Sequence, residues 1–141
     1  MRALLAICVL AVAVAGCGGG GSGDSAKDFD GAERGVADAI EKIEAAARDR
    51  DPDKVCKELL SDSLLAALEK KGTNCKTGVE EGFDDADSLD LKVDDVTIRG
   101  DTATAKVTSG RANSKQKTDT LTLQRDGAVW KITSLGAPAS G

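Results

Sequence analysis

The pattern of apolar residues changes once along this chain, from a helical period to an alternating one. Between residues 28 and 84 apolar side chains recur at steps of three and four, which is typical of helices with one buried face. From residue 89 onward they alternate with polar residues, as in strands with one buried face. Helices followed by a strand meander predict an α+β fold. We expect N-terminal helices packed on a curved, cone-like antiparallel sheet of about four strands.

The helical half divides into one long helix and a group of shorter ones. The predicted helices span residues 28–49, 52–60, 61–71 and 77–85. Asp51 and Pro52 suit the N-cap and the first position of the second helix. Gly72 fits the stop after the third helix, whose apolar residues Leu64, Leu65 and Leu68 are expected to face inward.

Strand signals fill the second half of the chain. The predicted strands span residues 89–98, 102–108, 118–125 and 128–135. The apolar phase slips by one residue at Asp94 and Asp95, which predicts a β-bulge. Asp126-Gly127 is a strong signal for a two-residue hairpin turn. Trp130 and Ile132 are expected on one face of the last strand and Val129 on the other.

The N-terminus carries a targeting signal. Arg2 precedes an uncharged apolar run at residues 3–15, which has the length of a signal-peptide core and is too short to cross a bilayer. The segment Val-Ala-Gly-Cys at residues 14–17 resembles the bacterial lipobox, with Val14 where Leu is usual. That resemblance implies cleavage between Gly16 and Cys17 and lipidation of Cys17. The alternative is a simply secreted protein in which Cys17 has no role.

These signals divide the chain into four parts. We expect a signal peptide at residues 1–16, a lipidated Cys17 with a Gly/Ser tether at residues 17–27, a domain at residues 28–135 and a flexible tail at residues 136–141. The membrane would then be a partner through the lipid, on the extracytoplasmic face of a bacterial cell membrane.

Two cysteines remain once the signal peptide and the lipidated residue are set aside. Cys8 leaves with the signal peptide, whereas Cys56 and Cys75 stay in an oxidising compartment and are expected to pair. Such a bond stabilises a small domain by roughly 3 kcal/mol. Their spacing does not match a CxxC redox or zinc site.

Composition excludes several classes of function. The chain has no His and no Tyr, which removes the usual general base near neutral pH and any Ser-His-Asp or Cys-His arrangement. The net charge is −5 and no basic block is present, so we expect no nucleic-acid partner. We assign no catalytic residue, metal ligand or cofactor. An acidic run that includes Asp85 and Asp87 raises calcium as an alternative, but Leu89 and Asp90 break the EF-hand pattern.

Two segments resemble a known superfamily. They are Leu-Thr-Leu-Gln-Arg-Asp-Gly-Ala-Val-Trp-Lys-Ile at residues 121–132 and Val-Thr-Ile-Arg-Gly-Asp-Thr-Ala-Thr-Ala at residues 96–105. With the long first helix, they resemble the nuclear-transport-factor-two-like, cystatin-like cone proteins in a lipoprotein form. That resemblance implies a bent sheet around a helix, with a pocket at its wide end. Relatives often dimerise through the sheet, so a homodimer is implied by analogy.

Two functions follow from this resemblance. The first is a non-enzymatic module that binds a small ligand or an envelope protein. The second is a small carboxylate-dependent isomerase or hydrolase of the ketosteroid-isomerase type, with Asp90, Asp94 or Asp119 as its base. Deep carboxylates with raised pKa values favour the enzyme, whereas a cone filled by Leu, Ile and Trp side chains favours the binding module.

Overall fold

The computed structural model describes residues 25–84, 90–110 and 115–135. Its elements, in chain order, are the 3₁₀ helix η1 (Ser25–Asp28), α1 (Gly31–Arg48), α2 (Pro52–Lys54), the π-helix η2 (Val55–Leu59), α3 (Asp62–Lys70), α4 (Cys75–Asp84), β1 (Leu91–Arg99), β2 (Thr102–Ser109), β3 (Lys117–Asp126) and β4 (Val129–Ser134). Cys17, Gly16, the Gly/Ser run and residues 136–141 lie outside the described residues. None of the described helices is long and apolar enough to span a bilayer.

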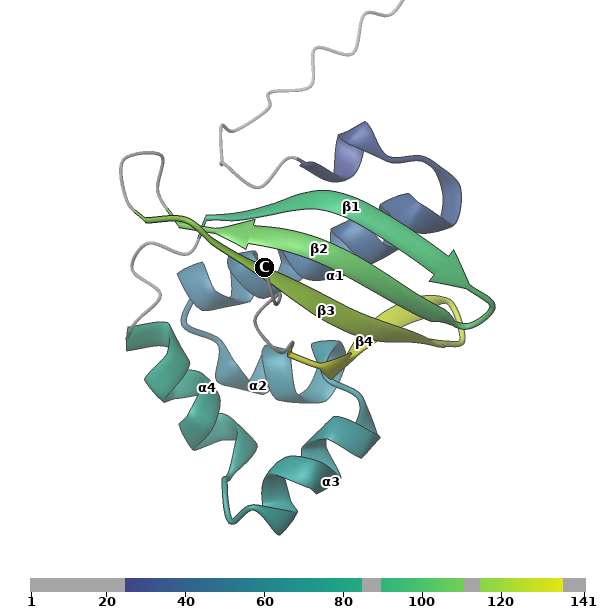
Figure 1. Ribbon diagram of the computed structural model, residues 1–141. Helices are drawn as coiled ribbons and strands as arrows, with labels where there is room; N and C mark the ends of the chain where they lie inside the picture. Colours follow the sequence, from purple (N-terminus) through teal and green to yellow (C-terminus); the bar gives the residue numbers. More distant parts are fainter. Residues whose placement is uncertain (1–24, 85–89, 111–114, 136–141) are drawn as a thin grey trace, which may run out of the picture.

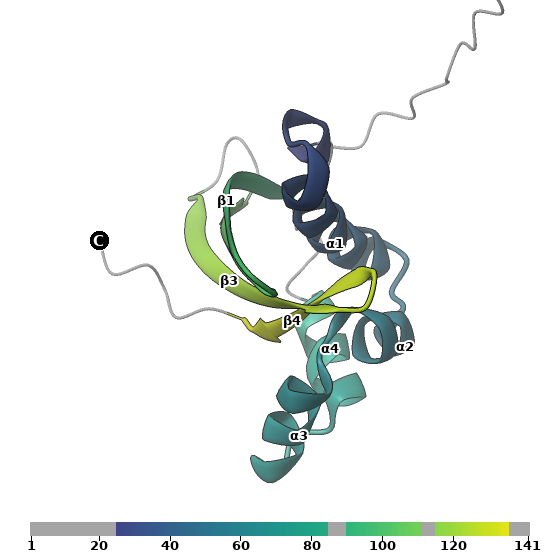
Figure 2. The same cartoon turned by 90° about the vertical axis from the view of Figure 1, so that its right-hand side faces the viewer.

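The four strands form one antiparallel sheet in the order β1-β2-β3-β4. The sheet curves around α1, which lies along its concave side, and it does not close into a barrel (Figures 1 and 2). The α+β prediction, with N-terminal helices on a curved four-stranded sheet, is therefore confirmed.

The core lies between α1 and the concave face of the sheet. Val36 and Ile40 of α1 have no exposed surface, and neither has Leu123 of β3. The β2 residues that face α1 are small, since Ala103 and Ala105 are also fully buried. Small side chains on the central strand let the helix approach the sheet closely, which is how a chain with two Phe and one Trp fills its interior.

The strand predictions are confirmed in their alternation and in the bulge. The register of β1 against β2 shifts between Val93 and Asp95, and Val93 and Val96 are both buried across the shift. The turn after β3 differs by one residue from the prediction. Asp126 pairs with Val129, so the turn consists of Gly127 and Ala128, with Gly127 at φ 62°. Asp126 stays in the ladder, where its carboxylate is paired with the Nζ atom of Lys131 at 3.1 Å.

Residues 52–84, which form α2, η2, α3 and α4, are called the helical annex below. The predicted cap at Asp51 is confirmed, because the N–H of Lys54 donates to Asp51 Oδ1 at 3.0 Å. Ser61 caps α3 in the same way, since its Oγ accepts the N–H of Leu64 at 3.2 Å. The predicted second helix is mostly a π-helix, in which the N–H of Leu60 donates to the carbonyl of Val55 at 3.1 Å. The Cys56–Cys75 disulfide is present and joins η2 to α4.

The helix α3 packs less deeply than its sequence predicts. Leu64, Leu65 and Leu68 touch the core but are only half-buried, and α3 has no fully buried residue. Figure 2 shows the reason, since α3 begins beside β4 and then projects away from the sheet.

Both edges of the sheet are covered by other parts of the chain. On the β1 edge, the N–H of Val93 donates to Ser25 Oγ at 3.2 Å. Ser25 and its neighbour Ala26 fall in the expected tether, yet both are buried. On the β4 edge, the N–H of Ser61 donates to the carbonyl of Ile132 at 2.9 Å. The cover is local, at Val93 and at Ile132, where it keeps the edge backbone groups from pairing with another chain.

Candidate functional site

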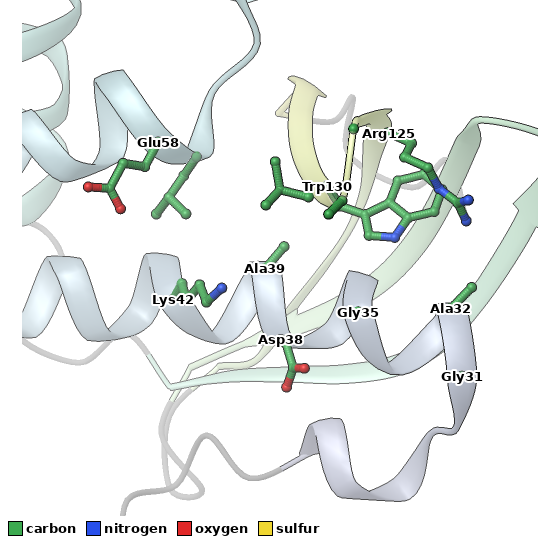
Figure 3. Close-up of a pocket in the computed structure, with 13 residues that line it drawn as sticks. Gly31, Ala32, Gly35, Asp38, Ala39, Lys42, Glu58, Arg125 and Trp130 are labelled. Atoms are coloured by element: carbon green, nitrogen blue, oxygen red, sulfur yellow. The ribbon is translucent and has the colours of Figure 1, made fainter.

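A groove opens between α1, η2 and the β3–β4 hairpin, with a volume of about 410 Å³. Figure 3 shows its walls, with α1 along one side and Trp130 and Arg125 at one end. Glu58 and Lys42 lie at the other end. The groove has the size of a small-molecule site.

The wall contributed by α1 is made of small residues. Gly31, Ala32, Gly35 and Ala39 line the groove from this helix. A Cβ atom added at Gly35 would lie 3.3 Å from Cδ1 and 3.4 Å from Nε1 of Trp130. Gly35 therefore lets the indole ring lie directly against the helix backbone, although glycine costs helix stability.

At the hairpin end, Trp130 and Arg125 form a cross-strand pair. They are directly opposite each other in the β3–β4 register, and the guanidinium carbon of Arg125 lies 4.9 Å from the indole centroid. A cation over an indole face is attracted by the ring quadrupole. The stacking orders Arg125 without neutralising it, because its guanidinium has no carboxylate partner among the described residues.

Trp130 is only 6% exposed, yet its indole N–H donates to no acceptor in the described parts of the chain. A buried indole nitrogen usually has a hydrogen-bond partner. Every completely buried side-chain polar atom of the described residues has a hydrogen-bond partner. Because Nε1 has none, it is not completely buried, and it is accessible from the groove that Trp130 lines. The edge of the indole ring that carries Nε1 is turned toward α1 at Gly35 (Figure 3).

The opposite end of the groove carries one charge of each sign. Lys42 is presented by α1 and Glu58 by the π-helix η2. Neither forms an ion pair with another residue of the described segments. Asp38 also lines the groove, but its carboxylate points away from Trp130 (Figure 3). Glu58 is presented by a π-helix, and π-helical turns are frequent at functional sites.

The structure does not bring the predicted candidate bases together at this groove. Asp119 lies on the concave face at the far end of β3, opposite Val107, with Lys117 Nζ 3.2 Å from its carboxylate. Asp94 accepts a hydrogen bond from the Thr108 hydroxyl on the exposed side. Asp90 precedes β1, and its carbonyl accepts the N–H of Gly110 at 3.2 Å.

Glu44 is the one charged residue that is fully buried in the described segments, and its side chain is 2% exposed. Its Oε1 atom accepts a hydrogen bond from Arg48, and its Oε2 atom accepts the N–H of Leu91 at 3.3 Å. Oε2 therefore joins α1 to the edge of β1, whereas Oε1 is held by Arg48 within the same helix. From the sequence, Glu44 belongs to the polar face of the helix, and only the tertiary fold shows that a strand edge covers it.

In the described segments, no group of three or more His, Cys, Asp or Glu residues is placed to hold a metal ion. Asp85 and Asp87, which suggested calcium, lie outside the described residues.

The residues of the groove were not predicted as a site. The apolar pattern does not single out Gly35, and it places Trp130 only on one face of the last strand. A glycine at a stripe position of a helix is the one sequence signal that could have indicated a close contact. No family model, curated protein or solved structure matches this chain, so the functional argument rests on its own geometry.

Proposed function

We propose that the protein is a lipid-anchored extracytoplasmic lipoprotein whose cone-like domain is a non-enzymatic binding module. The observation that carries this proposal is the groove, where a wall of small apolar residues lies between the unpaired polar groups of Arg125 and Trp130 at one end and those of Lys42 and Glu58 at the other. A concave site with a few convergent polar groups is the usual form of a ligand site. The anchor rests on the lipobox-like residues 14–17.

The packing of the cone favours binding over catalysis. Its concave face is filled by Ile40, Leu123, Trp130 and Ile132, which are all buried. The groove carboxylates, Asp38 and Glu58, are exposed, and the buried Glu44 is held by Arg48 and Leu91. No observation on the described residues favours the alternative, a carboxylate-dependent isomerase or hydrolase.

The anchor is tested by mass spectrometry of the membrane fraction. We expect a mature chain that begins at Cys17 and carries acyl groups, and we expect Cys17→Ala to release the protein from the membrane. An unmodified Cys17, or a mature chain that begins elsewhere, would contradict the anchor.

The binding role is tested by native mass spectrometry of the protein purified from its own membranes. We expect the wild type to retain a small molecule and Gly35→Leu to lose it, because the new side chain would collide with Trp130. Gly82→Leu is the matched control, since a Cβ at this glycine of α4 meets nothing within 4 Å. Equal retention by both variants, or none by the wild type, would contradict a ligand in this groove.

A further inference from the structure

We propose that the groove binds a short peptide-like ligand whose free carboxylate lies at the end formed by Arg125 and Trp130. This inference rests on the proposed binding function and names the ligand class of the same groove. Donors from four residues at the carboxylate end, the free backbone groups of Trp130 and the size of the groove wall carry it.

The first step concerns the donors that an anion would meet. Asp30, the N-cap of α1, makes no side-chain capping bond, so the N–H groups of Gly31 and Ala32 have no acceptor among the described residues. An uncapped helix N-terminus attracts negative charge. Arg125, whose guanidinium has no carboxylate partner, and the unpartnered indole N–H of Trp130, a residue that is 6% exposed, lie at the same end.

A planar anion suits this set better than a neutral group. Guanidinium binds carboxylates through parallel N–H donors, and charge-assisted hydrogen bonds are stronger than neutral ones. The nearest carboxylate of the lining on α1, Asp38, points away from Trp130. No carboxylate of the described residues forms an ion pair with Arg125.

The second step concerns the backbone of β4. The N–H of Arg125 donates to Asp101 on the β2 side, and the carbonyl of Ile132 accepts Ser61 on the outer side. Backbone groups alternate along an antiparallel strand, so the N–H and C=O of Trp130 point outward like those of Ile132. The chain covers this edge at Ile132 but not at Trp130, whose backbone groups have no partner outside the ladder among the described residues.

An amide group of a ligand can therefore pair with Trp130 in the manner of an added strand residue.

The third step is size. Ala32 and Ala39 leave a shallow wall on either side of the contact between Gly35 and Trp130, which accommodates methyl-sized side chains on the ligand. At the far end, Lys42 and Glu58 offer one charge of each sign, so that end suits polar groups without selecting a net charge.

The experiment uses the mature lipoprotein in detergent micelles and two probes, N-acetyl-alanyl-alanine and its C-terminal amide. Trp130 is the only tryptophan of the chain, so its indole N–H gives one side-chain NMR signal and all the tryptophan fluorescence. We expect the free acid to shift the indole signal at lower concentration than the amide, by a factor of about ten.

The variants separate Arg125 from a general charge effect. Arg125→Gln is expected to weaken binding of the acid by about tenfold and to leave the amide nearly unchanged, with Arg125→Lys between them. Arg99→Gln, which removes the same charge at the exposed end of β1, is the matched control and should leave both affinities unchanged. Backbone NMR spectra of each variant report whether it is folded, and the amide affinity shows whether the groove is intact.

Two results would overturn this proposal. One is equal affinity for acid and amide, and the other is the absence of any shift up to about 10 mM acid probe. If the native mass spectrum still shows a retained molecule that Gly35→Leu loses, the groove remains a binding site and only the carboxylate class is wrong. If it shows none, the binding function itself fails.

Discussion

The α1–sheet core and the helical annex are stabilised by different means. In the core, Val36, Ala37, Ile40 and Ala46 of α1 have no exposed surface. In the annex, Val55, Leu59, Leu60 and Phe83 are buried, but α3 has no fully buried residue. A disulfide and the surface ion pair Asp53–Lys76 join α4 to η2 and α2. Regions with few buried apolar contacts open at lower free energy than the core of the same protein. We therefore expect the annex, and α3 above all, to open at lower free energy than the α1–sheet core.

This difference bears on the groove, because its two long walls belong to different units. The wall formed by α1 and Trp130 is part of the core, whereas Glu58 and Leu59 are supplied by η2 of the annex. The annex meets the core sheet through the backbone bond from Ser61 to Ile132 and the buried side chains of Leu59 and Leu60. Loosening the annex should widen one side of the groove and leave the Arg125–Trp130 end intact.

The largest effect is expected from a cavity in the core. Ile40→Ala removes a fully buried side chain and should lower the free energy of unfolding by about 2–5 kcal/mol. Leu64→Ala is the comparison in the annex, where a half-buried leucine should cost only about 1 kcal/mol. Urea unfolding followed by circular dichroism measures both, and equal losses would refute the contrast between the two units.

The disulfide gives the next largest effect. Replacing Cys56 and Cys75 together by Ser should lower the free energy of unfolding by about 3 kcal/mol. Its location is the sharper test, because the bond lies within the annex. Native-state hydrogen exchange should become faster in α3 and α4 and change much less in α1 and β2. Reduced wild type should behave like the double variant, and uniform acceleration across the sheet would show that the annex is no separate unit.

Local rules predicted the elements of this fold well. The steps of three and four in α1, the alternation in β2 and the slip at Asp94 and Asp95 are consequences of one buried face, and the structure confirms each of them. The caps at Asp51 and Ser61 were predictable because capping is a contact within three residues.

The groove was not predictable in the same way. It depends on the approach of Trp130 to Gly35, and these residues are far apart in sequence. The apolar pattern does not indicate the π-helix at Val55–Leu59, because that pattern does not show which carbonyl accepts each N–H. Here the N–H of Leu60 donates to the carbonyl of Val55 and not to the α-helical acceptor four residues back. The same holds for Glu44, whose burial depends on β1.

The smallest effect is expected from the ion pairs of Asp53, which join α2 to α4. Lys76 Nζ lies 2.7 Å and Lys57 Nζ 3.2 Å from this carboxylate. The hydrogen bond from Lys76, followed by that from Lys57, lowers the pKa of Asp53 below its ordinary value of 3.8, and the same pair raises the pKa of Lys76 above 10.5. Both side chains are exposed to solvent, so water screens the interaction and its contribution is small.

The sign of the pH dependence follows from these directions. Because the pKa of Asp53 is lowered on folding, its contribution is complete above pH 3.8 and is lost as the pH falls through the lower folded value. Because the pKa of Lys76 is raised, its contribution is complete below pH 10.5 and is lost as the pH rises through the higher folded value. Asp53→Asn should therefore lower the urea midpoint slightly between these limits, and the difference from the wild type should vanish beyond each of them.

Glu81→Gln, which neutralises an exposed carboxylate of α4 with no ion pair among the described residues, should show no such window. A loss of stability in Asp53→Asn that persists at acid pH would mean that Asp53 stabilises the annex by its packing and not by its charge.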